Sequence, residues 1–98
     1  MFVKIHNSYR DVIAICDENL LGKKFEEDKF QLDVKESFYN GEKKDASQIA
    51  ELLLHEKTED ATFNIVGEES VNAAIKAGIV TKQGIKTIQG VPFALVLL

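Results

Sequence analysis

The sequence contains few residues of the types that build a disulfide scaffold or cross a membrane. It has one Cys, one Pro, one Met and no Trp in 98 residues. A lone Cys cannot form an internal disulfide, which excludes a disulfide scaffold and fits a reducing compartment. The longest apolar run, residues 93–98, is far shorter than the ~20 residues of a membrane-crossing helix. No signal peptide pattern follows Met1, so we expect a cytoplasmic protein with no membrane partner.

Arginine and net positive charge are also scarce. Arg10 is the only Arg beside eleven Lys, and sixteen acids against twelve bases give a formal net charge of −4. Base-specific DNA binding usually combines a basic surface with the planar Arg guanidinium, so we expect no sequence-specific DNA partner. The acidic excess lies in residues 45–60, whereas residues 23–44 balance six Lys against six acids.

Hydrophobic residues make up 45% of the chain, enough for one core, and we expect a single compact domain over residues 1–98. Alternating or short apolar segments predict several strands. They cover about residues 2–7, 12–16, 30–34, 62–66, 85–88 and 93–97. Residues 12–16 are apolar on both faces, which predicts a central strand. If this strand forms a hairpin with residues 2–7, Cys16 faces Phe2 or Val3.

Two helices complete the predicted order β-β-β-α-β-α-β-β. Asp45 and Gln48 match a capping box, and the apolar spacing that follows predicts a helix to about His55 or Lys57. Gly67 opens a second helix, with Gly78 as its C-cap. The predicted fold is therefore α/β of the α+β type: a mixed five- to six-stranded sheet with helices on one face.

Cys16 and Asp17, at the end of the second strand, are the first candidates for chemistry. A nucleophilic thiolate needs a lowered pKa and a base that takes its proton. The predicted hairpin places His6 ~13 Å along the strand from Cys16, so it does not imply a Cys–His dyad. We therefore prefer the interpretation that Cys16 is a small buried hydrophobic residue. His6 and His55 lack the spacing of metal ligands, and we predict no metal, no cofactor and no catalytic residue.

A lysine- and aromatic-containing segment over residues 23–44 is a second candidate. Exposed Lys and aromatic side chains together can hold single-stranded RNA. The alternative, which we prefer, is that Phe25 and Phe38 belong to the core and that the interleaved acids neutralise the Lys residues. The candidate binding residues from both sites are Cys16, Asp17, Gly22, Lys23, Lys24 and Tyr39.

Five short segments together resemble a known family. They are residues 12–23 (VIAICDENLLGK), 38–41 (FYNG), 64–67 (NIVG), 77–80 (AGIV) and 90–92 (GVP). Their order over nearly the whole length is similar to that in the small archaeal domain-of-unknown-function family DUF424. The resemblance implies a compact intracellular domain. It carries over no catalytic residue, because the family has no established activity.

Two functional hypotheses follow from the sequence. The preferred one is a non-enzymatic binding or accessory module that associates with a protein partner or an RNA-containing assembly, because no catalytic constellation is present. The alternative is a small enzyme or ligand-binding protein that uses the Cys16–Asp17 strand end and the turn over residues 20–23. If the apolar C-terminal strand lies at a sheet edge, it also predicts a homodimer through that strand.

Overall fold

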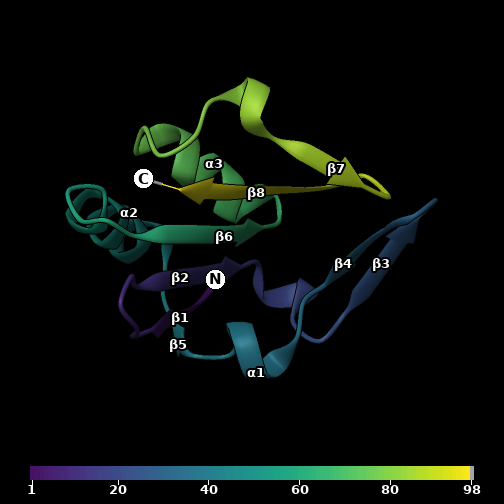
Figure 1. The fold of residues 1–98 in the computed structure, drawn as a ribbon, viewed down its shortest axis with the longest axis horizontal. Coiled ribbons are helices and arrows are strands. Elements are labelled where there is room, and N and C mark those ends of the chain that lie inside the picture. Colours follow the sequence, from purple (N-terminus) through teal and green to yellow (C-terminus); the bar gives the residue numbers. More distant parts are fainter. Residues whose placement is uncertain (98) are drawn as a thin grey trace.

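The computed structural model describes residues 1–97 and contains a mixed six-stranded sheet (Figure 1). The strand order is β5-β1-β2-β6-β8-β7, with β2 and β6 parallel and all other neighbours antiparallel. The strands are β1 (Phe2–His6), β2 (Val12–Cys16), β5 (Glu42–Lys43), β6 (Thr62–Val66), β7 (Lys86–Ile88) and β8 (Val91–Leu97). The predicted class, a mixed sheet combined with helices, is confirmed. Among residues 1–97, no helix is long and apolar enough to cross a membrane.

Strand β2 lies in the interior of the sheet, as its apolar sequence predicts. It pairs with β1 on one side and β6 on the other, and its last four residues are buried. In the first hairpin Phe2 faces Cys16 and His6 faces Val12, which is one of the two registers left open by the sequence. Because side chains alternate along a strand, Ile13 and Ile15 point to one face of the sheet and Cys16 to the other.

Two helices, α2 (Ala46–Glu56) and α3 (Glu68–Lys76), cover one face of the sheet (Figure 1). The predicted capping box is present: Gln48 N donates to Asp45 Oδ1 at 2.8 Å, and Asp45 N donates to Gln48 Oε1 at 3.0 Å. The helices and the sheet enclose the larger core, which we call the helical core. Its fully buried large side chains are Ile13, Ile15, Ile49, Leu53, Phe63 and Ile65.

The opposite face carries a second core beneath α1 (Glu36–Tyr39) and the hairpin of β3 (Lys24–Glu27) and β4 (Phe30–Asp33). The predicted strand over 30–34 is confirmed, but it forms a separate two-stranded sheet with β3. Elements β3, α1 and β5 are absent from the order predicted by the sequence. The turn of the β3–β4 hairpin is formed by Asp28 and Lys29, without the glycine that commonly marks such a turn. Two 3₁₀ turns, η1 (Glu18–Leu20) and η2 (Lys82–Gly84), complete the chain.

Strand β8 does not have the edge position that the homodimer prediction assumed. It lies between β6 and β7, so β8 is not the outermost strand of the sheet, although residues 94–97 pair with β6 alone. Strand β7 reaches only residues 91–93 of β8, whereas β6 pairs with residues 93–97. Leu98, the last residue of the predicted apolar segment, lies outside the described residues.

Candidate functional site

Cys16 and Tyr39, two of the predicted binding residues, are buried in the second core. Cys16 has no exposed surface and Tyr39 is 6% exposed. Burial, helped by the negative charge of Asp17, raises the pKa of the Cys16 thiol to about 11. Burial also raises the pKa of Tyr39 to about 12. At neutral pH the thiol is therefore protonated and shielded from solvent, which is the opposite of what a nucleophile needs.

Asp17 caps the N-terminus of α3. Its Oδ1 accepts from Ser70 N at 2.8 Å and from Ser70 Oγ at 2.7 Å, and its Oδ2 accepts from Glu69 N at 3.1 Å. The helix N–H groups at this end are thus satisfied by a carboxylate that is distant in the sequence. Asp17 is 7% exposed, so its carboxylate serves the fold and is not displayed to a ligand.

Gly67 makes the close approach of Asp17 to α3 possible. Its φ is +107°, and a Cβ at this position would lie 2.3 Å from Asp17 Cγ. Any side chain at Gly67 would therefore displace the carboxylate. The N–H groups of this strand–helix turn, which in other proteins can bind an anion, thus face a carboxylate of the same chain.

Gly22, Lys23 and Lys24 form the base of the β3–β4 hairpin. Gly22 N donates to Val34 O at 2.7 Å, and Val34 N donates to Lys23 O at 2.9 Å. Both lysines are exposed, and Lys24 Nζ lies 3.9 Å from Glu26 Oε1. The six predicted residues therefore divide into a buried set and an exposed hairpin base.

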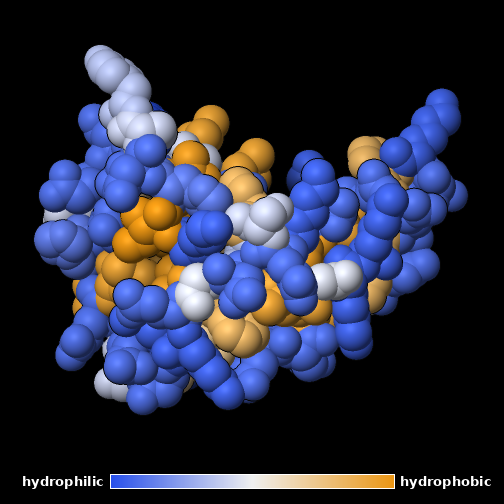
Figure 2. Space-filling view, turned by 90° about the horizontal axis from the view of Figure 1, so that it is seen from below, coloured by the Kyte–Doolittle hydropathy of each residue, from blue (hydrophilic) through white to orange (hydrophobic). Residues whose placement is uncertain are grey.

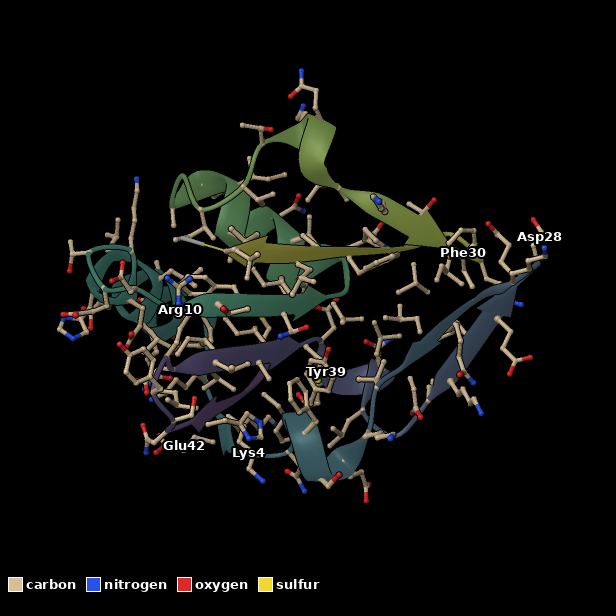
Figure 3. All side chains as sticks on the ribbon, viewed as in Figure 1. Lys4, Arg10, Asp28, Phe30, Tyr39 and Glu42 are labelled. Atoms are coloured by element: carbon tan, nitrogen blue, oxygen red, sulfur yellow. The ribbon has the colours of Figure 1, made fainter. Side chains whose placement is uncertain are left out.

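Three aromatic side chains of residues 23–44 pack against or within the second core, whereas a fourth, Phe30, is 70% exposed. Phe25 and Phe38 lie against the second core, and Tyr39 belongs to it. The Phe38 ring stacks on His6 with centroids 4.5 Å apart. In Figure 3, Tyr39 lies between α1 and the sheet. Phe25, Phe38 and Tyr39 are occupied by contacts within the chain, so a base could stack on one of these three rings only by displacing it.

Two lysines of the same segment pair with acids. Lys43 Nζ lies 2.7 Å from Glu18 Oε1, and Lys44 Nζ lies 3.0 Å from Glu42 Oε2. The contact with Lys43 lowers the pKa of Glu18. The interleaved acids thus neutralise part of the lysine charge, as the preferred interpretation expects. RNA association stays a prediction.

A groove between α2 and α3 is a candidate site that no sequence motif indicates. Its volume is about 730 Å³. The lining residues are Met1, Lys44, Asp45, Ala46, Ser47, Ala50, Leu54, Glu69, Asn72, Ala73, Lys76 and Ala77. The helices meet below it at their C-terminal ends, where Lys57 Nζ donates to Ala77 O at 3.2 Å. We call this hollow the helical groove.

The side chains of the helical groove separate into an apolar stripe and charged rims. Ala46, Ala50 and Leu54 follow one another at i, i+4 and i+8 on α2, which places them in one row. Leu54 is 57% exposed although it is a large apolar side chain. A signal for it exists in the sequence, because three consecutive leucines at 52–54 cannot all face the sheet from one helix.

Within residues 1–97 no group of three or more His, Cys, Asp and Glu side chains could hold a metal ion. The helical groove offers an apolar surface bordered by charges of both signs, which suits non-covalent binding.

Comparisons with known proteins agree on the kind of protein but name no activity. A family model described as "Protein of unknown function (DUF424)" matches residues 6–98. A solved structure, of an uncharacterized conserved protein from Methanopyrus kandleri, is 28% identical to this chain with a TM-score of 0.77. That match covers 98% of this chain and 90% of the other. A search of curated proteins found no match.

Proposed function

Because this chain belongs to the DUF424 family, whose description assigns no activity, we propose a function from the geometry of its surface. The protein is a non-enzymatic accessory module that holds a helical segment of a partner protein in the helical groove. This proposal keeps the binding role inferred from the sequence and moves it away from the six residues predicted there.

The observation that carries the proposal is the exposed apolar row of α2. Leu54, 57% exposed, stands at the end of a row that continues through the small side chains of Ala50 and Ala46. Small residues let another helix approach the backbone closely, and a leucine at the end of the row gives that helix an apolar contact. An amphipathic helix recognises such a groove with apolar side chains at i, i+3, i+4 and i+7.

The length of the row sets the size of the expected ligand. From Ala46 to Leu54 the helix rises ~12 Å, at 1.5 Å per residue. A partner segment of two to three helical turns spans that length. A small polar metabolite would leave the alanines and Leu54 without an apolar partner.

Charges of both signs border the apolar row. Lys44 and Asp45 stand beside the start of α2, and Glu69 and Lys76 stand on α3. A partner helix with acids and bases on its two flanks can pair with these side chains at the rim. Such rim pairs contribute more to orientation and selectivity than to affinity.

Affinity capture with site-specific photocrosslinking tests the proposal. A photoreactive amino acid at Ala50 should become covalently linked to a defined protein from a cell lysate, and the crosslinked peptide should be helical and amphipathic. Ala50→Glu places a charge and added volume in the row, so it should abolish this enrichment. Position 50 is exposed, so the fold should tolerate the substitution.

Glu51→Lys is the matched control. Glu51 is exposed on the same helix but does not line the groove, and its replacement should leave the enriched proteins unchanged. Equal enrichment by wild type and Ala50→Glu, with no specific crosslink from position 50, would contradict the proposal.

A further inference from the structure

The sheet face opposite the helices is only partly covered. Helix α1 and the β3–β4 hairpin lie over Ala14, Cys16 and Val66, and they leave an adjacent area of β2, β6 and β8 accessible. We call this area the open face. It consists of Val12, Thr62, Asn64, Leu95 and Leu97.

Strand register places the residues of the open face in two neighbouring rows. Val12, Thr62 and Leu97 are successive partners in one row. In the next row, Asn64 is the partner of Leu95. Leu95 is 65% exposed and Leu97 is 70% exposed, on the same side of the sheet. Two neighbouring leucines with this exposure form an apolar area that no segment of residues 1–97 covers.

The β3–β4 hairpin extends from the body of the molecule as an arm (Figure 1). Figure 3 shows Phe30 near the outer end of this arm, next to Asp28 at its turn. Phe30 is 70% exposed, so the arm carries a large apolar side chain away from both cores. An exposed aromatic side chain at the end of a projecting hairpin is a typical anchor for a pocket on another molecule.

The arm is fixed to the body and needs little ordering before it binds. Gln89 N donates to Glu27 Oε1 at 3.0 Å, and Gln89 Nε2 donates to Glu26 O at 2.7 Å. At its base, Phe25 and Leu32 pack in the second core. A preformed arm loses less conformational entropy on association than a flexible loop does.

The arm and the open face lie on the same side of the molecule. In Figure 2 exposed apolar side chains stand on both sides of a hollow in the upper outline, which separates the arm from the rest of the molecule. A two-fold rotation therefore brings the arm of one copy over the open face of another, and the second arm makes the same contact in return. This is the self-complementary arrangement that a two-fold dimer requires.

The charges also fit this arrangement. Residues 26–29 of the arm contain Glu26, Glu27, Asp28 and Lys29, so three acids and one base give this segment a net charge of −2. The charged side chains in the rows of the open face and the row beside it are Lys4, partner of Ala14, Lys86, partner of Phe93, and Lys43, which is the partner of Phe2 and is paired with Glu18. An acidic arm thus meets a face with basic neighbours, which favours a second copy of this chain as the occupant.

We propose that two copies of this chain form a dimer in which the arm of each copy packs Phe30 against Leu95 and Leu97 of the other. The helical groove lies on the opposite face of the sheet, so the dimer presents two of these grooves outward. This inference goes beyond the proposed function and does not depend on it.

Light scattering over a dilution series tests the dimer. Wild type should have twice the monomer mass at high concentration and dissociate on dilution. Phe30→Asp, at an exposed position, and the double variant Leu95→Asp/Leu97→Asp should each remain monomeric at every concentration. Circular dichroism should show that both variants keep the fold. A monomeric wild type at all concentrations overturns the proposal, and so does a dimer that survives both sets of substitutions.

Engineered cysteines test the predicted contact directly. In Phe30→Cys/Leu97→Cys, the two thiols lie at opposite ends of one molecule, because the arm and the end of β8 point in opposite directions in Figure 1. Oxidation should therefore give a disulfide-linked dimer. The control Phe30→Cys/Leu54→Cys places the second thiol on the helical side and should stay largely uncrosslinked. Equal crosslinking of both pairs overturns the proposed dimer geometry. It does not contradict the proposed function of the helical groove.

Discussion

At the scale of single residues, the pair of Asp17 and Gly67 explains why a promising strand end is not a reactive site. The carboxylate is hydrogen-bonded to the start of α3, and the missing Cβ of Gly67 leaves the room for it. In the sequence, the position of Asp17 next to Cys16 at the end of a strand suggests a reactive site. In the structure the same residue joins β2 to a helix more than fifty positions away.

The contact predicts a large effect of Gly67→Ala. The substitution forces φ = +107° on a residue with a Cβ and drives that Cβ against the Asp17 carboxylate. We expect the free energy of unfolding to fall by about 3 kcal/mol, measured by urea denaturation. Gly90→Ala is the control, because Gly90 also has a positive φ but a Cβ there would meet no atom within 4 Å. It should lose only about 1 kcal/mol, and equal losses would contradict the steric explanation.

Because Cys16 is buried, we expect the free energy of unfolding to fall in alkaline solution. Its pKa rises from 9.0 to about 11 on folding, so between these values the unfolded chain binds fewer protons than the folded one. Stability is therefore complete below pH 9 and falls as the pH rises towards 11, by about 1.4 kcal/mol at pH 10 from this group alone. Urea denaturation of wild type and Cys16→Ala at pH 7 and pH 10 measures the difference. An unchanged pH dependence in Cys16→Ala would show that the thiol does not cause it.

At the scale of elements, the two long helices form where local signals are strong. Helix α2 begins at a reciprocal capping box, and α3 is followed by Gly78, with Ile79 N donating to Ala74 O at 2.9 Å. The short elements β3, β5 and α1 carry no such signal. They span only two to four residues each, and contacts with the sheet hold them in place.

The capping box predicts a local and separable contribution to stability. Asp45→Ala removes the acceptor for Gln48 N and should lower the free energy of unfolding by about 1 kcal/mol. Asp45→Asn keeps an oxygen acceptor at the same place and should lose at most a few tenths of that value. Chemical denaturation compares the three proteins, and an Asn variant as unstable as the Ala variant would argue against the cap.

At the scale of the whole molecule, the distribution of charged and aromatic side chains determines whether the protein can bind RNA. The net charge is −4, Lys24, Lys43 and Lys44 lie beside acids, and the aromatic rings of residues 23–44 other than Phe30 pack against the second core. We therefore expect no retention of total RNA in filter-binding assays at moderate salt. Salt-sensitive retention that is lost in Lys23→Ala/Lys24→Ala would establish the RNA association predicted from the sequence.

Much of the fold was accessible from the sequence, but the candidate sites were not. Alternation and helical spacing located β1, β2, α2, β6, α3 and β8, because each of these elements buries one face or both. The helical groove combines residues from two helices and the N-terminal strand region, and the open face combines three strands. Neither set of residues is contiguous in the sequence. No single local pattern therefore predicts the helical groove or the open face.

The sequence by itself determined the α+β class, the burial of Cys16 and the capped start of helix α2. These properties depend on composition and on periodicities within about ten residues, which the chain encodes locally. Only the tertiary structure decided that β8 lies between β6 and β7 in the strand order, that Asp17 caps a distant helix, and that Leu54, Leu95, Leu97 and Phe30 stay exposed. Whether an apolar side chain is buried depends on which elements pack over it, and that is settled by long-range contacts.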